Sequence, residues 1–218
     1  MRFDDEYFDE RYAEAEGDPW GYYESEYERR KGERPLAALR DRKAPEEVDR
    51  ILDLGCGNGA KTRLATEAYP DAEVVGVDCS KEALDAAREW APDASYERAD
   101  IVDWVAESER AFDAVVAVGS LYYLCADYSV TDLFEFADDL RGVVADDGLL
   151  VAAHNHMPRD DGPVFAQERT VRTVRTILES NFETVERSRY EAEKQAGIDP
   201  EEPAEQPYEV WALRPASG

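Results

Sequence analysis

The stretch "ILDLGCGNGAKT" at residues 51–62 joins an apolar run, a glycine-rich turn and the start of an amphipathic segment. Glycines allow the backbone to turn sharply and to approach a ligand, and the helix that follows offers free N–H groups at its N-terminus. Gly55, Gly57 and Gly59 form G-x-G-x-G, with the third glycine one residue too early for the dinucleotide fingerprint G-x-G-x-x-G. Asp53 stands at the end of the expected strand, where a carboxylate suits a cationic amino-acid ligand better than a pyrophosphate.

Apolar runs and amphipathic segments alternate along the chain, as expected for a parallel sheet covered by helices. Strands are predicted at 50–55, 72–78, 94–100, 112–120 and 148–156, and all but the third are the continuous apolar runs typical of buried parallel strands. Helices are expected after the first strand and at 80–91, 130–144 and 166–179, with a turn at "DDG" 146–148. Segments 181–191 and 206–215 alternate apolar with polar residues, which predicts two antiparallel strands with one wet face.

Two more carboxylates follow later strands of this layout. Asp78 ends the second strand, where a carboxylate can accept hydrogen bonds from both hydroxyls of a ribose. Asp100 follows the third strand, where it could accept a hydrogen bond from an adenine amino group. Each acid alone is explained equally well as a helix cap or a solvated turn. Three acids at successive strand ends, beside a G-x-G-x-G turn, together indicate a ligand site.

These segments resemble the class I S-adenosylmethionine-dependent methyltransferases over about residues 48–156. "LDLGCGNG" is similar to their first motif, and later motifs are similar to Asp78, "AD" at 99–100, "FDAVVAVGSLYYL" at 112–124 and "DDGLLVAAH" at 147–154. The resemblance implies a Rossmann-like seven-stranded sheet, mostly parallel with the last strand antiparallel, helices on both faces and an N-terminal helical cap. It also implies S-adenosyl-L-methionine as cofactor and S-adenosyl-L-homocysteine as product.

By position, the resemblance implies three groups of cofactor-binding residues. The methionine part would lie beside Asp53 and the three glycines, the ribose beside Asp78, and the adenine beside Asp100 and Ile101. Gly119 would lie against the other side of the cofactor, and Cys79 follows the ribose carboxylate directly.

The segments outside this core narrow the resemblance. "YFDERY", "DPW", "SEYERRK", the "LYYL" after the fourth strand and a closing "YEVWALRP" resemble the nodulation protein S (NodS) group. Members of that group N-methylate the free amine of a deacetylated chitin-type oligosaccharide. The resemblance therefore implies in-line methyl transfer to the nitrogen of a small amine or amino sugar.

The aromatic stretch "GDPWGYYESEYERRK" at 17–31 precedes the first strand, and we expect it to form a lid over the cofactor. Aromatic faces attract cations such as a sulfonium or an ammonium, and Trp20 and Tyr27 are the candidates. Lys31, four residues after Tyr27, would lie on the same helix face and could reach the cofactor carboxylate. The alternative is an ordinary helix packed on the sheet with a solvated basic end.

An amine must lose a proton before it attacks a methyl group. His154 and His156 lie at the carboxyl end of the fifth strand, and imidazole has a suitable pKa for a general base. We take His154 as the candidate base and His156 as a substrate contact. After the fourth strand, Tyr122 is a candidate catalytic residue and Tyr123 a substrate contact. Surface or capping roles for the histidines, and packing for the tyrosines, are the alternatives.

Other functions remain open from the residues alone. A related enzyme could methylate oxygen or carbon of another small molecule, and a non-catalytic protein could bind the cofactor without turnover. An NAD-dependent oxidoreductase is disfavoured, because the G-x-G-x-x-G fingerprint is missing and Asp53 is present.

Composition limits the partners. The chain has 51 acidic and 25 basic residues, a formal net charge of −26, which disfavours nucleic-acid binding and leaves a small molecule as the expected partner. Only five basic residues are lysines, and an acidic, lysine-poor surface is typical of halophiles, here haloarchaeal-like; an acidic mesophilic enzyme is the alternative. Three widely spaced cysteines without a Cys/His cluster predict no metal site.

The predicted organisation is one domain over residues 1–218. It comprises an N-terminal helical cap or lid (1–47), a cofactor-binding α/β core (48–156), and a C-terminal helix with an antiparallel hairpin (157–218). No apolar run is long enough to span a membrane, and the N-terminal segment lacks the apolar core of a secretory signal, so we expect a cytoplasmic location. The oligomeric state is left open.

Overall fold

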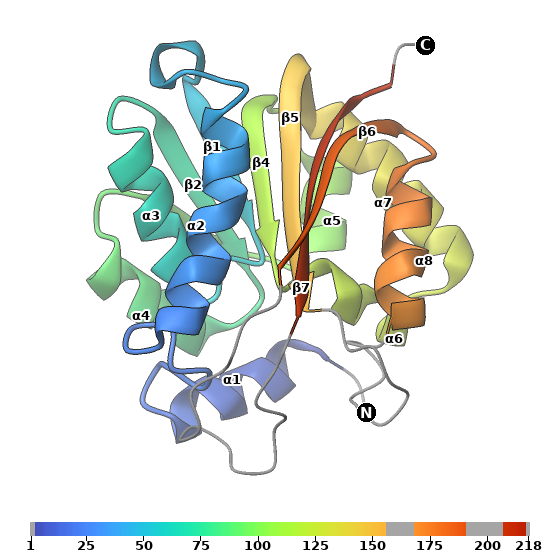
Figure 1. The fold of residues 1–218 in the computed structure, drawn as a ribbon. Coiled ribbons are helices and arrows are strands. Elements are labelled where there is room, and N and C mark those ends of the chain that lie inside the picture. The colour runs from blue at the N-terminus through green and yellow to red at the C-terminus, as the bar shows by residue number, and fades with distance from the viewer. Residues whose placement is uncertain (1–2, 156–167, 191–206, 217–218) are drawn as a thin grey trace.

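The computed structural model describes residues 3–155, 168–190 and 207–216, and the strands of these segments form one sheet of order β3-β2-β1-β4-β5-β7-β6 (Figure 1). The parallel strands are β1 (Arg50–Leu54), β2 (Glu73–Asp78), β3 (Ser95–Arg98), β4 (Phe112–Val118) and β5 (Val144–Asn155). At the far edge, β7 (Tyr208–Pro215) runs antiparallel to β5 and to β6 (Phe182–Tyr190). The predicted Rossmann-like seven-stranded sheet with an antiparallel last strand is confirmed.

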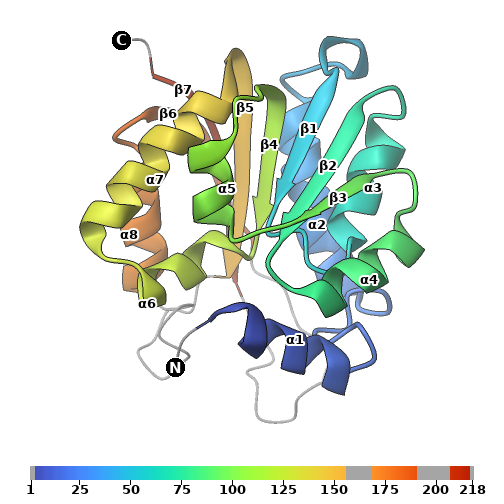
Figure 2. The same ribbon diagram turned by 180° about the vertical axis from the view of Figure 1, so that it is seen from behind.

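Helices cover both faces of the sheet (Figures 1 and 2). Side chains of successive strand residues point to opposite faces, so β5 supplies Leu150 and Ala152 to one apolar core and Val151 and Ala153 to the other. The first core is covered by α5 (Ile101–Glu107), α7 (Val130–Val143) and α8 (Glu168–Leu178). The second is covered by α2 (Glu26–Arg40) and α3 (Ala60–Ala68).

The remaining helices lie at the ends of the strands. α1 (Asp5–Glu14) and α4 (Lys81–Trp90) contact each other, and α6 (Leu124–Asp127) follows the short 3₁₀ turn η2 (Leu121–Tyr123) after β4. A second 3₁₀ turn, η1 (Pro45–Glu47), leads into β1. Ser80 caps α4 by accepting a hydrogen bond from the backbone N of Ala83 at 3.1 Å.

The predicted turn at 146–148 is wrong in detail. β5 begins at Val144, and the register with β4 shifts between Phe112, which faces Val144, and Ala114, which faces Leu149. The acidic "DDG" residues are therefore an irregular bulge inside one long strand. A Cβ added to Gly148 would lie 2.8 Å from the carbonyl oxygen of Ala145, so the backbone folds tightly there, as a turn sequence allows.

The predicted N-terminal cap divides into two parts. α1 lies across the end of the sheet where β1, β2 and β4 finish, at the lower end in Figure 1. α2 instead lies along the face of the sheet, with Leu36 and Leu39 buried beside Ile51 and Val151. Within the described part of the predicted cap, α1 and the turns after it therefore cover the strand ends, and α2 does not. Parts of the predicted C-terminal segment, at 157–167 and 191–206, lie outside the described residues.

Within the described part of the chain, the helices are all too short or too polar to cross a membrane. The same residues hold no group of three or more His, Cys, Asp or Glu side chains that could bind a metal ion.

Candidate active site

The glycine-rich turn after β1 is a cradle that side chains would fill. Gly55 and Gly57 have φ values of +75° and +54°, in the left-handed region that favours glycine. A Cβ added to Gly55 would lie 2.4 Å from Cβ of Ser120, and one added to Gly57 would lie 2.4 Å from Oη of Tyr12. Both positions therefore need glycine for backbone conformation and for space.

Asp78 holds this cradle in place. One of its carboxylate oxygens accepts a hydrogen bond from the backbone N of Gly57 at 2.8 Å, and the other accepts from the backbone N of Ser80 at 3.0 Å. Burial raises the pKa of Asp78, although these two backbone donors oppose the shift. The carboxylate at the end of β2 thus ties the glycine turn to the start of α4.

Asp53 is only 2% exposed and accepts a hydrogen bond from Oγ1 of Thr62 at 2.6 Å. Burial raises the pKa of Asp53 to about 6, and the bond from Thr62 opposes the rise. The carboxylate predicted beside the turn is therefore inside the site, and α3 positions it through Thr62. Sequence reasoning missed Thr62, because a threonine in a helix carries no pattern of its own.

The other predicted cofactor residues lie at the same strand ends. Asp100 caps α5 by accepting a hydrogen bond from the backbone N of Val102. In this structure it therefore has the helix-cap role that was the alternative to adenine binding. Ile101 follows it and packs against the core on the α5 side. Cys79 is partly buried after Asp78, and Gly119 has a φ of +72° after β4. The structure brings all four to the edge where the glycine turn lies, because parallel strands all end at that edge.

The segment after α1 is fastened to the glycine turn through Asn58. This side chain is 1% exposed, and its amide nitrogen donates hydrogen bonds to the carbonyl oxygen of Gly17 at 2.9 Å and to Oδ1 of Asp18 at 3.2 Å. The carbonyl oxygen of Asn58 accepts a hydrogen bond from Oη of Tyr23 at 2.8 Å. Part of the aromatic stretch therefore does cover the loop, through residues other than those predicted.

The two aromatic lid candidates take different places. Trp20 packs near the site against Tyr12 and Tyr22, with ring centroids 5.4 and 5.7 Å apart. Tyr27 is 4% exposed and packs edge-on against Tyr208 at 6.0 Å, in the core between α2 and the sheet. Tyr27 is therefore a core residue of an ordinary helix packed on the sheet, and it is not part of a lid.

Lys31 belongs to a buried cluster of charges. Its Nζ lies 2.8 Å from the carboxylate of Glu28 and 3.4 Å from Oδ1 of Asn155 at the end of β5. Lys61 lies 3.4 Å from the same carboxylate and 3.3 Å from the ring centroid of Tyr22. Burial alone would raise the pKa of Glu28, but the two lysines lower it, and burial lowers the pKa of Lys61 to about 8. Sequence reasoning missed Glu28 and Lys61, since only the fold brings α2 and α3 together.

The candidate catalytic residues lie deeper than expected. His154 is fully buried, with its ring centroid 5.4 Å from that of Tyr122 and 4.9 Å from that of Trp211. Neither ring nitrogen has a hydrogen-bond partner in the part of the chain that the structure describes. Burial lowers the pKa of His154 to about 3, so the imidazole is neutral and its protonated form is disfavoured. Tyr123 packs beside Tyr122, and His156 lies outside the described residues.

The strand order and the site together define the class. A G-x-G-x-G turn follows β1 of a 3-2-1-4-5-7-6 sheet, and carboxylates stand at the ends of β1 and β2. This is the fold of class I methyltransferases, whose cofactor is S-adenosylmethionine. The residues fit that cofactor, because the cradle admits no side chain, Asp53 is available to its ammonium group and Asp78 to its ribose.

Comparison with known families gives one match, to the segment that holds the glycine turn. Residues 51–148 match the family model described as "Methyltransferase domain". This segment, just under half of the chain, is therefore similar to methyltransferase domains.

Individual relatives agree with that match. Trans-aconitate 2-methyltransferase of Escherichia coli O157:H7 (strain EC4115 / EHEC) is 37% identical over 97 residues, 44% of this chain and 38% of the relative. The enzyme of the same name from Variovorax paradoxus is 40% identical over 91 residues, 42% of this chain and 35% of the relative. The chain thus matches well under half the length of these curated relatives.

Solved structures share the fold. A TehB-like SAM-dependent methyltransferase from Corynebacterium glutamicum has a TM-score of 0.61 at 18% identity, covering 97% of this chain and 100% of that one. The structure of a DhpI–SAH complex has a TM-score of 0.60 at 19% identity, covering 98% and 95%. At these identities the likeness concerns the fold alone.

Proposed function

We propose that the chain is an S-adenosylmethionine-dependent methyltransferase that transfers a methyl group to the nitrogen of a small amine or amino sugar. The observation that carries the proposal is the glycine cradle, held by Asp78 and covered by the segment that Asn58 fastens. The resemblance of the N-terminal segment to the NodS group supports nitrogen as the acceptor atom. One domain over residues 1–218 and a cytoplasmic location remain part of this proposal.

The proposed roles follow from charge and position. Asp53 would hold the ammonium of the methionine part, Asp78 the ribose hydroxyls, and Lys31 the carboxylate. When bound, S-adenosylmethionine supplies a methyl group on a positively charged sulfur. The amine lone pair forms the new N–C bond as the C–S bond breaks, so acceptor and methyl group must be held in line.

The chain also has to exclude water from the site, and the acceptor amine has to be unprotonated when it attacks the methyl group. Trp20 and the turn on Asn58 would shield the site, and an aromatic ring is a favourable neighbour for a sulfonium. His154 and Tyr122 remain the proposed catalytic residues, and both are buried. Because the pKa of His154 is about 3, its role would be to accept a hydrogen bond while the amine arrives already neutral.

A second candidate is methylation of a small carboxylic acid. Two observations favour it: the curated relatives are named for trans-aconitate, and Lys31 and Lys61 share the single carboxylate of Glu28. Two buried ammonium groups on one carboxylate leave N–H donors for an anionic acceptor.

The test is a methyl-transfer assay in molar salt across amines, amino sugars, phenols and carboxylates, alongside calorimetric binding of S-adenosylhomocysteine. We expect turnover with an amine, and at least tenfold weaker binding in Asp78→Ala, about 1.4 kcal/mol. The matched control Asp138→Ala changes an exposed aspartate on α7 and should bind like the wild type. Tight binding without turnover on any acceptor would sink the enzyme proposal, and unchanged binding in Asp78→Ala would mean that the site is misplaced.

A further inference from the structure

We propose that Tyr12 is a cofactor-contacting residue, whose hydroxyl group donates a hydrogen bond to an oxygen atom of S-adenosylmethionine at the glycine cradle. α1 would close the site by carrying this residue into place. The inference rests on the proposed function and adds a residue that neither the glycine motif nor the predicted lid residues include.

The first support is the place of the hydroxyl group. Tyr12 is 3% exposed, and a Cβ added to Gly57 would lie 2.4 Å from its Oη. The hydroxyl therefore lies over the turn whose backbone N is held by Asp78, next to the proposed ribose site. The tyrosine comes from α1, whereas the cradle it touches follows β1.

The second support is the lack of a hydrogen-bond partner for the hydroxyl group of Tyr12 in the described part of the chain. Among the described residues, the Tyr12 hydroxyl makes no hydrogen bond, although its ring packs against Trp20 and its backbone oxygen accepts from the N of Gly17 at 2.8 Å. The fully buried side-chain atoms without a partner in the described residues are the ring nitrogens of His154, so the Tyr12 oxygen is not sealed from its surroundings and a ligand at the cradle can reach it. Burial, and then the nearby charge of Asp78, raise the pKa of Tyr12, so the hydroxyl keeps its proton and acts as a donor.

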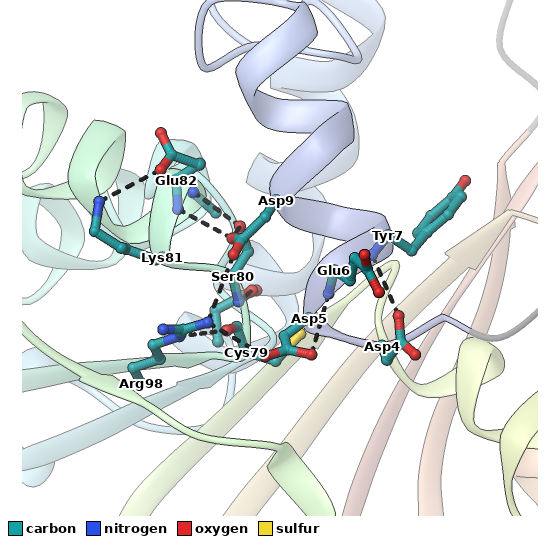
Figure 3. A network of polar contacts seen from close by, with 12 residues as sticks. Asp4, Asp5, Glu6, Tyr7, Asp9, Cys79, Ser80, Lys81, Glu82 and Arg98 are labelled. Carbon is teal, nitrogen blue, oxygen red and sulfur yellow. Dashed lines mark hydrogen bonds and ion pairs between the residues drawn. The ribbon is translucent and has the colours of Figure 1, made fainter.

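The third support is the way α1 is docked (Figure 3). Oδ1 of Asp9 accepts hydrogen bonds from Oγ of Ser80 at 2.7 Å and from the backbone N of Glu82 at 3.2 Å, at the start of α4. The guanidinium of Arg98 lies 3.5 Å from Asp9 and 3.3 Å from Asp5. These contacts attach α1 to the start of α4 and to the end of β3.

Docking and the cofactor site share one residue. Ser80 donates its hydroxyl to Asp9 of α1 and its backbone N to Asp78 of the cradle. Asp9 precedes Tyr12 by three positions, so both side chains lie on neighbouring parts of one helix surface. Asp9 is therefore a positioning residue that acts through Tyr12.

The competing explanation is that Tyr12 occupies the place of the cofactor and must leave before binding. The two explanations predict opposite effects of shortening the side chain. A contact residue loses affinity when the hydroxyl is removed, whereas a plug gains affinity.

The experiment measures the dissociation constant of S-adenosylhomocysteine by calorimetry in molar salt for wild type, Tyr12→Phe and Tyr7→Phe. One lost hydrogen bond should weaken binding of Tyr12→Phe about threefold to tenfold. Tyr7 is on the same helix with its ring against Phe3 and Phe8, so Tyr7→Phe should stay within about twofold of wild type. Urea unfolding without ligand checks that each variant is folded.

A truncated ligand identifies the accepting oxygen. 5′-Methylthioadenosine keeps the ribose but lacks the amino-acid carboxylate. If Tyr12→Phe weakens this ligand by the same factor, the acceptor is on the ribose; if only S-adenosylhomocysteine is affected, the acceptor is the carboxylate. Both results support the contact.

Asp9 is tested by dissociation kinetics. Asp9→Ala should speed release of S-adenosylhomocysteine several-fold, and Asp9→Asn, which keeps an accepting oxygen, should restore part of the loss. In the Tyr12→Phe background, Asp9→Ala should speed release of S-adenosylhomocysteine by a smaller factor, because the hydroxyl group through which Asp9 acts is already absent.

Two results would overturn the inference, and they are distinguishable from failure of the proposed function. If the wild type binds S-adenosylhomocysteine and Tyr12→Phe binds it with equal or higher affinity, the Tyr12 contact is refuted and the proposed function stands. Wild-type protein that does not bind S-adenosylhomocysteine refutes the proposed function and the inference with it.

Discussion

Gly57→Ala tests the position of Tyr12 without any ligand. The added Cβ would lie 2.4 Å from Oη of Tyr12 but 3.6 Å from its Cζ, which is an ordinary van der Waals contact. Gly57 also has a φ of +54°, which a residue with a side chain rarely adopts. The variant therefore suffers two penalties, and only one of them depends on the tyrosine hydroxyl.

The penalties can be estimated separately. The left-handed backbone costs about 1–2 kcal/mol for alanine, and an overpacked contact costs about 1–3 kcal/mol. We expect Gly57→Ala to lower the free energy of unfolding by about 2–5 kcal/mol in the wild type. In the Tyr12→Phe background only the backbone penalty remains, about 1–2 kcal/mol. The change in unfolded-chain entropy is common to both backgrounds and cancels.

The assay is urea unfolding of the four proteins of this double-mutant cycle at constant molar potassium chloride. Gly142→Ala is the matched control, because Gly142 lies in α7 with no atom within 4 Å of an added Cβ. That control should raise the free energy of unfolding by about 0.5–1 kcal/mol in both backgrounds. Equal costs of Gly57→Ala with and without the tyrosine hydroxyl would refute the placement of Tyr12 over the cradle.

Two further predictions concern buried ionisable groups. Burial lowers the pKa of Lys61 from 10.5 to about 8, so the unfolded chain binds more protons between these values and the free energy of unfolding should rise across pH 8–10.5. Lys61→Met should flatten this rise of the free energy of unfolding with pH, whereas Lys81→Met, which changes an exposed lysine, should not. An unchanged slope in Lys61→Met would contradict the burial of Lys61. Burial likewise lowers the pKa of His154 from 6.5 to about 3, so wild-type stability should fall as the pH drops through this window, and His154→Leu should remove that fall. Because neither imidazole nitrogen has a partner in the described residues, His154→Leu should leave stability at pH 7 unchanged or higher by urea unfolding; a large loss would reveal a partner.

The sheet could be predicted because its signal is local. Buried parallel strands read as continuous apolar runs, and the strands observed at Arg50–Leu54, Glu73–Asp78 and Phe112–Val118 lie within the predicted segments. The positions of Asp53 and Asp78 followed as well, since parallel strands end at one edge. A turn sequence inside β5 misled the prediction, because a bulge and a turn share the same residue types.

The covering of the site could be predicted only in outline. Aromatic residues before the first strand indicated a lid, yet Tyr27 went to the core beside Tyr208. Tyr12 and Tyr23 contact the glycine turn instead, and Asn58 of that turn donates a hydrogen bond to the carbonyl oxygen of Gly17. Periodicity says which side of a helix is apolar, but it does not say which part of the molecule that side meets.

The order of motifs along the chain was enough to indicate the fold class, the cofactor and the strand ends proposed to bind it, since each depends on residues close in sequence. The tertiary structure alone decided which side chains meet across the site: Glu28 between two lysines, Tyr12 over Gly57, and Asp9 on Ser80. These contacts join helices to distant loops, and their energy depends on burial and distance, which no local pattern encodes.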